Sequence, residues 1–392
     1  MTQVLKGLRV VEHGTFITGP AASMMLADMG AEVVKVELPG SGDPFRAFKG
    51  GLYSPHYQTY NRNKHSVALD TRKPEDRATF DALIEGADVY IQNFRPGFAE
   101  QIHAGEQRLR ELNPRLVYCA ISGFGQDGPA AGRPSYDTVA QAASGYLRLL
   151  VNPANPRVVG PAIADAMTGY YAAFGILGAL YERQASGQGR RVDVSMFEAM
   201  AHFNLDAFTH LFSVGEVMGP YSRPSVSQSY VLECACGGWI ALHMSSPEKF
   251  WQGLALAMER PDIFDDERFR DRTARIANQD ALIEVLGGIF RLRPRTEWCQ
   301  RLVAQDVPHA PMYRTDEVPE DAQAQHLQLF VDTHHPVMGA SRTVRSPISF
   351  DGQRSLQVMP PPTLGEHNAL YAHGWPTRQA EAAQPHKDKE TA

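Results

Sequence analysis

The sequence predicts an α/β fold in which a large domain, built on a doubly wound and mostly parallel sheet, is joined to a smaller α+β domain. Strand-like and helix-like segments alternate over the first 120 residues, and the composition changes at a Gly/Pro/Ser-rich stretch, residues 218–229. At 392 residues the chain also exceeds the usual size of a single hydrophobic core. Together these observations predict two domains.

The alternation near the N-terminus predicts a parallel sheet. Residues 9–13 and 31–37 are apolar strands that flank a helix over 21–29, and such a unit folds with a right-handed crossover. The pattern continues with strands at 66–70, 88–93 and 116–121 and a helix at 74–85. Each strand ends in polar or turn residues, at the edge where open parallel sheets bind ligands. The glycines after the first strand do not form G-x-G-x-x-G, which disfavours a nicotinamide dehydrogenase.

The rest of the chain predicts the domain boundaries. A long apolar helix over 160–183 carries small residues that favour close helix packing, and a strand at 191–196 and a second helix follow it. We expect residues 1–224 to form the first part of the large domain and residues 225–325 to form the small domain. Residues 326–392 are expected to return to the large domain, with a strand at 343–350.

Composition and charge limit the classes of function. A net charge of -6 without a basic patch argues against nucleic acid as a partner. Four scattered cysteines do not make a disulfide framework, and the N-terminus lacks the apolar segment of a secretory signal. We therefore expect a cytoplasmic protein that does not bind membranes.

One carboxylate is notable for its place at the start of the long apolar helix. Asp165 follows Gly160 and Pro161, and an acid just before a helix is a favourable N-cap. The helix N–H groups there favour the ionised form. An ionised, desolvated carboxylate is also the nucleophile that covalent acyl transfer requires. The residues alone leave both interpretations open, and the two are compatible.

Ordered sequence blocks run over nearly the whole chain. They are residues 5–11, 19–20 and 26–37, then 93–97, 122–129 and 136–137, the segment around Asp165, residues 187–196 and finally 362–367. In content and order these blocks resemble the class III CoA-transferases, the family that includes formyl-CoA transferase, carnitine CoA-transferase and the alpha-methylacyl-CoA racemases. The resemblance places Asp165 in the catalytic block of that family.

The resemblance implies an acyl-CoA:carboxylate CoA-transferase. In similar enzymes the matching aspartate attacks the thioester of a donor acyl-CoA, forming a mixed anhydride and then an aspartyl-CoA thioester that an acceptor acid attacks. Coenzyme A is then a substrate, and neither a tightly bound cofactor nor a metal is required. The resemblance also implies a Rossmann-like large domain and an interlocked homodimer, with acyl-CoA and a small carboxylic acid as partners.

Further site residues follow from the same blocks. Tyr136 and Asp137 are expected in the acyl pocket, although Tyr136 is equally compatible with core packing. Cationic and polar side chains near the ligand edge of the sheet can pair with the phosphates of CoA. The residues expected to contact CoA are Asn93, Phe94, Arg95, Asn63, Lys64 and Arg46.

Two alternatives to transfer remain, an alpha-methylacyl-CoA racemase or epimerase and a non-catalytic acyl-CoA-binding homologue. Racemases of this superfamily carry a histidine at the position of Tyr136, where it serves as a base. Here no histidine lies between His103 and His202, the interval that contains Asp165. The absence of a histidine base from that interval favours CoA transfer over racemisation.

The chain departs from the formyl-CoA transferase pattern at three positions. Leu38 and Gln101 stand where that enzyme has arginine, and Ile17 stands where it has glutamine. These departures put an oxalate-type substrate in doubt and leave the details of CoA contact open. The sequence therefore does not identify the acyl donor or the acceptor acid.

Overall fold

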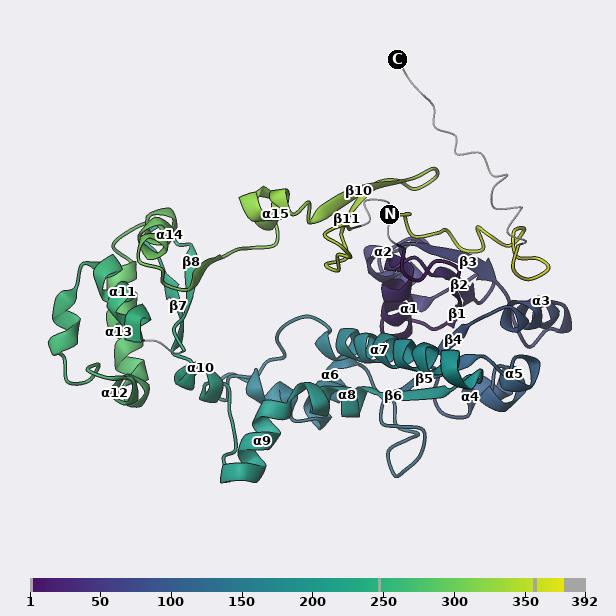
Figure 1. The fold of residues 1–392 in the computed structure, drawn as a ribbon, viewed down its shortest axis with the longest axis horizontal. Coiled ribbons are helices and arrows are strands. Elements are labelled where there is room, and N and C mark those ends of the chain that lie inside the picture. The colour runs from purple at the N-terminus through teal and green to yellow at the C-terminus, as the bar shows by residue number, and fades with distance from the viewer. Residues whose placement is uncertain (1–2, 246–247, 355–357, 377–392) are drawn as a thin grey trace, which may run out of the picture. The chain divides into compact units, whose positions relative to one another are not determined.

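The fold divides the chain into two compact units. A computed structural model describes residues 3–245, 248–354 and 358–376. The first unit comprises Met1–Leu147, Gly160–Leu205 and Gln328–Ala392, and the second comprises Arg148–Val159 and Asp206–Leu327 (Figure 1). Each unit has its own sheet and its own core.

The first unit contains a six-stranded sheet in which every pair of neighbours is parallel. The spatial order is β3-β2-β1-β4-β5-β6, so the direction of winding reverses between β1 and β4. This arrangement confirms the doubly wound parallel sheet expected from the sequence. The strands are β1 (Arg9–His13), β2 (Glu32–Glu37), β3 (Lys64–Ala68), β4 (Val89–Gln92), β5 (Val117–Ser122) and β6 (Arg191–Ser195).

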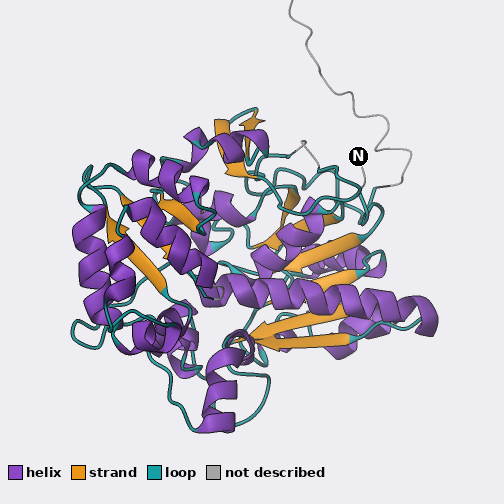
Figure 2. Cartoon of the chain, turned by 60° about the vertical axis from the view of Figure 1, so that its left-hand side comes forward, coloured by secondary structure: helices purple, strands orange, loops and turns teal. Residues whose placement is uncertain are grey.

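Helices cover both faces of this sheet, so most residues of its inner strands are buried. All residues of β4 and β5 are buried, as expected of strands that face a core on each side. On one face the strands pack against α1 (Thr18–Asp28) and α7 (Ile163–Ser186), and on the other against α3 (Pro74–Glu85) and α5 (Glu106–Leu112). Figure 2 shows the long α7 running beside the strands.

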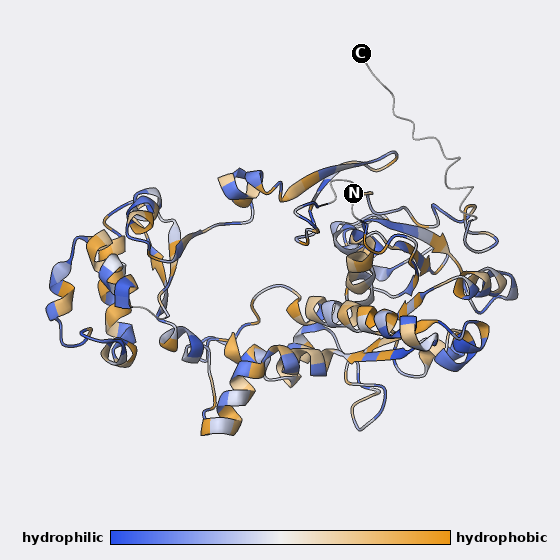
Figure 3. Cartoon of the chain, in the orientation of Figure 1, coloured by the Kyte–Doolittle hydropathy of each residue, from blue (hydrophilic) through white to orange (hydrophobic). Residues whose placement is uncertain are grey.

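Helix α7 packs closely against α1 because the contact surface carries small residues. A Cβ atom on Gly169 would lie 2.8 Å from Ala21 Cβ and 2.9 Å from the carbonyl oxygen of Thr18. Hydrophobic residues run along much of α7 (Figure 3), and by length and composition it is the one helix of the described chain that could cross a membrane. However, Ala172 and Ile176 are buried in the core of the first unit, as in the core helix of a globular protein.

The remaining elements of the first unit lie around this sheet. The helices are α2 (Pro55–Tyr60), α4 (Phe98–Gln101), α6 (Asp137–Ala143) and α8 (Met196–Phe203), with 3₁₀ turns at Pro44–Ala47 and Tyr146–Leu149. A separate antiparallel hairpin pairs β10 (Phe330–His335) with β11 (Gly339–Val344). Near the C-terminus, the N–H of His367 donates to the carbonyl of Ser66, so this segment lies along β3.

The strand expected over residues 343–350 is wrong in its bounds. The structure ends β11 at Val344, and Phe350 forms only an isolated bridge with Gln353. The pairing partner of β11 is β10, and the turn between them is closed at Gly339, which has a φ of 84°. In the hairpin register Val344 pairs with Phe330, the first residue of β10, so β11 ends where its partner strand begins.

The second unit is built on a three-stranded antiparallel sheet in the order β7-β8-β9. Its core includes the buried rings of Trp251, Phe290 and Trp298. The strands are β7 (Ser229–Glu233), β8 (Trp239–His243) and β9 (His309–Met312). The helices are α9 (Leu205–Val214), α10 (Ser222–Val226), α11 (Glu248–Met258), α12 (Arg272–Ala277), α13 (Gln279–Phe290), α14 (Arg295–Ala304) and α15 (Ala322–His326), with 3₁₀ turns at Pro261–Asp265 and Val318–Glu320.

Candidate active site

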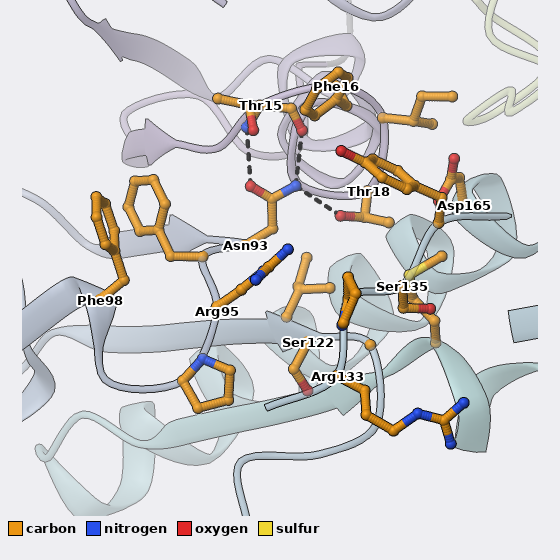
Figure 4. Close-up of a pocket in the computed structure, with 18 of the residues that line it drawn as sticks. Thr15, Phe16, Thr18, Asn93, Arg95, Phe98, Ser122, Arg133, Ser135 and Asp165 are labelled. Carbon is orange, nitrogen blue, oxygen red and sulfur yellow. Dashed lines mark hydrogen bonds between the residues drawn. The ribbon is translucent and has the colours of Figure 1, made fainter. Parts of the chain in front are cut away.

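A cavity of about 330 Å³ lies at the carboxyl ends of the central strands of the first unit (Figure 4). Residues 15–18 after β1 and residues 93–96 after β4 both line it. These two strands are the neighbours at which the sheet reverses its winding, the usual ligand site of such sheets. The other lining residues are Phe98, Ile121, Ser122, Gly123, Ala131, Arg133, Pro134, Ser135, Tyr136, Asp165 and Met196.

Asn93 connects the two lining loops, residues 15–18 and 93–96, through side-chain hydrogen bonds. Its side-chain oxygen accepts a hydrogen bond from the N–H of Thr15 at 2.9 Å, and its Nδ2 donates to the carbonyl of Thr15 at 2.7 Å. Nδ2 also donates to Oγ1 of Thr18 at 2.9 Å, and Figure 4 shows all three bonds. Asn93 was expected to contact CoA, but its side-chain polar atoms form hydrogen bonds to residues 15–18 and stabilise the loop after β1.

A buried charge cluster stabilises the loop after β1 through the carbonyls of Gly14 and Pro20. Lys35 Nζ donates to Glu12 Oε1 at 2.7 Å and to the carbonyl of Gly14 at 2.9 Å. Lys64 Nζ donates to Glu12 Oε2 at 2.8 Å and to the carbonyl of Pro20 at 2.9 Å. Burial alone would raise the pKa of Glu12, but the two ammonium groups lower it to about 2. The lysines therefore hold both ends of residues 14–20.

Three of the residues expected to contact CoA do not line the cavity. Lys64 is 1% exposed within the charge cluster just described. Arg46 is fully buried and donates to both carboxylate oxygens of Glu37, at 2.7 Å each. Asn63 donates to Asp28 Oδ1 at 2.8 Å, away from the cavity. These placements do not support the predicted phosphate contacts, whereas Asn93, Phe94 and Arg95 do line the cavity.

Asp165 lines the cavity from the first turn of α7. The prediction that it caps this helix is wrong, because the N-cap is Ala162 and Asp165 is already the third helical residue. Among the residues that the structure describes, none donates a hydrogen bond to the Asp165 carboxylate. Burial, together with the negative charge of Asp137, raises the pKa of Asp165 to about 7. The helix N-terminus was expected to favour the ionised carboxylate, whereas burial and the charge of Asp137 favour its protonated form.

Tyr136 and Asp137 occupy different places although they are adjacent in the chain. Tyr136 lines the cavity, is 62% exposed, and meets the ring of Phe16 edge to face with centroids 5.7 Å apart. Asp137 is not among the lining residues and instead accepts hydrogen bonds from the first turn of α7. Asp137 was expected in the acyl pocket, and its observed contacts are to the helix that carries Asp165.

Sequence reasoning missed the second arginine of the cavity. Arg133 lies in the loop after β5, and Figure 4 shows it with Arg95 among the lining residues. Within the described chain, neither guanidinium has an acidic partner, although Arg133 lies over the ring of Phe124 at 4.9 Å. The signal that could have revealed Arg133 is its place after a parallel strand, between the blocks of residues 122–129 and 136–137.

A second cavity of about 310 Å³ adjoins the first and was also not anticipated. The two share Thr15, Phe94 and Phe98 as lining residues. The last two residues of β2, residues 38 and 41–44 after it, and residues 69–72 after β3 form most of its wall. His13 also lies on it, and burial and the positive charge of Lys35 lower the pKa of His13 to about 4, so its ring is neutral near pH 7.

Comparison with known proteins identifies the family. The profile described as CoA-transferase family III matches residues 5–368. The chain belongs to CoA-transferase family III. The chain is an acyl-CoA:carboxylate CoA-transferase, as the sequence blocks implied.

Similar proteins support this assignment over almost the whole length of the chain. A formyl-CoA:oxalate CoA-transferase of Streptomyces avermitilis is 32% identical, with 94% of each chain covered. The human succinyl-CoA:glutarate CoA-transferase is 28% identical, covering 93% of this chain and 84% of its own. A crystal structure of a CAIB/BAIF family protein from Brucella suis matches with a TM-score of 0.83 and 29% identity, covering 94% of this chain and 98% of its own.

Proposed function

We propose that this CoA-transferase works through a covalent intermediate on Asp165. The observation that carries the proposal is a half-buried carboxylate that lines the cavity at the switch point of the sheet and has no hydrogen-bond donor among the described residues. A carboxylate without donors keeps its lone pairs available for attack, and partial desolvation makes it more reactive. Each step below uses only that carboxylate and the two substrates.

In the first half of the proposed reaction, an Asp165 oxygen attacks the carbonyl carbon of the donor thioester. The C–S bond breaks, CoA leaves as its thiolate, and a mixed anhydride remains on Asp165. The thiolate then attacks the aspartyl carbonyl, which releases the donor acid as a carboxylate and leaves an aspartyl-CoA thioester.

The second half reverses this order with the acceptor acid. Its carboxylate attacks the aspartyl-CoA carbonyl, expelling the CoA thiolate and forming a second anhydride. The thiolate attacks the acyl carbon of the acceptor, so that the new acyl-CoA forms and the Asp165 carboxylate is regenerated. No proton is gained or lost over the cycle, but Asp165 has to enter it ionised.

We further propose that acyl-CoA lies across the two adjoining cavities. The thioester end belongs beside Asp165 in the first cavity, and the nucleotide end belongs in the second, against the ends of β2 and β3. Arg95 stands near the shared wall and has no acidic partner among the described residues, so its charge is free to pair with a phosphate or carboxylate.

For the acids, we propose short dicarboxylates. The similar enzymes are named for succinyl-CoA, glutarate, formyl-CoA and oxalate. A cavity of about 330 Å³ that carries the cationic Arg95 suits a small acid with a second negative charge. Within the described chain no histidine lines this cavity, which favours transfer over an alpha-proton reaction that needs such a base.

A homodimer is proposed from the exposed apolar face of α7. Tyr170, Phe174 and Tyr181 are 46%, 77% and 79% exposed, and their spacing places them on one side of the helix. Large exposed aromatic residues of this kind are typical of subunit interfaces. Sedimentation at several protein concentrations tests this: a single species of twice the chain mass is expected, and a monomer at all concentrations would contradict it.

The activity is tested with purified protein, succinyl-CoA and a series of C2 to C6 acids. We expect new acyl-CoA products whose appearance depends on both substrates, and Asp165→Asn should reduce the rate to background. Asp193→Asn is the matched control, because Asp193 is an exposed carboxylate on β6 that pairs with Arg191 outside the cavity. Undiminished transfer by Asp165→Asn contradicts the covalent mechanism, and deuterium entry at the alpha carbon without CoA exchange contradicts transfer itself.

A further inference from the structure

We propose that Asp137 is a positioning residue: it caps helix α7 from outside and so keeps the Asp165 side chain unbonded and turned into the cavity. This inference rests on the proposed function of Asp165 as the nucleophile. It goes beyond that function, because it assigns to a neighbouring acid the geometry and the charge state of the reacting group.

The first turn of α7 lacks a cap of its own. The N-cap position is Ala162, which has no side chain able to accept a hydrogen bond, and Gly160 and Pro161 precede it. The first N–H groups of a helix have no partner within the helix, so an acceptor has to come from elsewhere. Asp137 Oδ1 supplies it, accepting from the N–H of Ala164 at 2.8 Å and from that of Asp165 at 3.3 Å.

Asp137 is itself held in place. Its other oxygen, Oδ2, accepts a hydrogen bond at 2.6 Å from Nε2 of Gln141, one turn further along α6. Gln141 is 1% exposed, so this bond is shielded from water. Both oxygens of Asp137 are thus occupied, one by α7 and one by its own helix, and the carboxylate has little freedom to rotate.

Occupation of the helix end by Asp137 frees Asp165 from that role. An acidic side chain at the third helical position commonly turns back toward the N-terminal N–H groups of its own helix. Here the N–H of Asp165 itself already donates to Asp137, and no described residue donates to the Asp165 carboxylate. The side chain instead lines the cavity. Without Asp137, the unpaired N–H groups of the first turn of α7 would form hydrogen bonds to the Asp165 oxygens and draw that side chain out of the cavity.

Asp137 also acts on Asp165 through its charge. Its negative charge adds to burial in raising the pKa of Asp165 to about 7. The phenol of Tyr60 also lies within electrostatic range of both acids, and Tyr170 on α7 lies close to Tyr60. Arg95 and Arg133 line the same cavity. Of the two acids, Asp137 receives the helix donors and Asp165 does not, so their environments divide the roles of cap and nucleophile.

The two functions of Asp137 are separated by two substitutions. Asp137→Asn keeps a side-chain oxygen that can accept from the helix, but the charge is lost. A flip of the Gln141 amide would turn its Oε1, unpaired in the structure, toward the new amide donor. Asp137→Ala removes both the cap and the charge. Asp271→Ala is the control for the loss of a cap, because Asp271 caps α12 in the second unit through the N–H of Ala274.

The rate of acyl transfer to Asp165 is measured across pH by quenching and peptide mass. For Asp137→Asn we expect the acid limb to move to lower pH by about half a unit or more, with the plateau rate largely kept. For Asp137→Ala we expect a plateau loss on the order of ten- to 100-fold, and for Asp271→Ala no change in rate or limb. An unchanged or upward-moving limb in Asp137→Asn, or a full plateau rate in Asp137→Ala, would overturn the proposal.

An independent readout separates this inference from the proposed function. Carbon-13 NMR of labelled aspartate, with the Asp165 signal assigned by its loss in Asp165→Asn, gives the pKa of Asp165 in the intact protein without any reaction. If wild-type protein forms no adduct, the proposed function fails. The inference fails separately if Asp137→Asn leaves the Asp165 titration where it is in the wild type.

Discussion

The rings of Phe16 and Tyr136 meet edge to face, with their centroids 5.7 Å apart, on the wall of the cavity that contains Asp165. Phe16 has a φ of 61°, a conformation that costs a residue with a side chain about 1 kcal/mol or more. Its N–H is held by Asp43 Oδ1 at 3.2 Å, and Asp43 in turn lies 3.0 Å from Lys35 Nζ. The structure thus holds a strained aromatic residue in place where the acyl group is proposed to bind.

Tyr136→Ala should therefore broaden the acyl specificity. Removal of the ring opens the wall against Phe16, so that longer acyl chains gain access while short ones lose contacts. We expect kcat/KM to fall about tenfold for the shortest donor and to rise for donors longer by two or three carbons, since each buried methylene is worth about 0.8 kcal/mol. Tyr313→Ala in the second unit is the control; a parallel fall for all donors would show that the wall does not select chain length.

The buried charge cluster should be needed for stability. Lys35→Met leaves Glu12 and Asp43 without one of their cationic partners inside the core. Breaking a buried ion pair on one side costs about 3–5 kcal/mol, which should appear as a lower urea midpoint. The exposed pair Lys249–Asp306 provides the comparison: Lys249→Met should cost less than about 1 kcal/mol. Equal losses in the two variants would contradict the role of burial.

The same cluster predicts the behaviour in acid. Glu12 has a pKa of about 2 in the folded protein, below its ordinary value of 4.5. A carboxylate whose pKa is lowered on folding stabilises the fold above its unfolded pKa, and this contribution is lost as the pH falls through the folded value. We expect wild-type stability to decline between about pH 4.5 and 2 and the decline to be shallower in Glu12→Gln, measured by urea unfolding at each pH. Parallel profiles would contradict the assignment.

Asp165 predicts the opposite trend. Its folded pKa of about 7 lies above the ordinary value of 3.8, so its contribution to stability is present below that value and lost as the pH rises through 7. Asp165→Asn should therefore be more stable than wild type above pH 7, by roughly 2 kcal/mol after allowance for partial exposure, and should differ little in acid. Thermal unfolding at both pH values measures this, and a destabilised Asp165→Asn at high pH would contradict it.

Helix α7 offers a matched pair of glycines. Gly169→Ala would bring a Cβ to 2.8 Å from Ala21 Cβ and 2.9 Å from the Thr18 carbonyl, whereas Gly178→Ala meets nothing within 4 Å. We expect Gly169→Ala to cost about 1–3 kcal/mol and to lower activity, because Thr18 bonds to Asn93 at the cavity floor. Gly178→Ala should gain up to about 1 kcal/mol from helix propensity. Equal effects would show that close packing is not required.

The fold could be predicted largely from the sequence because short apolar runs bounded by polar or turn residues alternate with helical segments along the first unit. Residues 9–13 and 74–85 were expected as strand and helix with the bounds that the structure has. The strand order could not be predicted, because it depends on pairing between distant segments, such as β5 with β6. The short helices α4 to α6 were missed because four to seven residues carry too little periodicity to be recognised.

Site residues could be predicted only where their position at the ligand edge of the sheet follows from the local sequence. Asp165, Tyr136 and Arg95 line the cavity because each follows a turn at the ligand edge. Lys64 was misplaced because its partner Glu12 lies 52 residues away, and no local pattern shows that the two meet in the core. The cap on α7 was assigned to Asp165 for the same reason, since Asp137 reaches it only through tertiary packing.

Trapping the covalent intermediate on Asp165 tests the proposed mechanism directly. Wild-type protein is incubated with the acyl-CoA donor that the activity screen identifies, treated with hydroxylamine and digested, and the peptide that contains Asp165 is analysed by mass spectrometry. We predict an aspartyl hydroxamate at Asp165 that requires the acyl-CoA and is absent from Asp165→Asn. CoA exchange that proceeds at full rate while Asp165 stays unmodified would rule out covalent catalysis by Asp165.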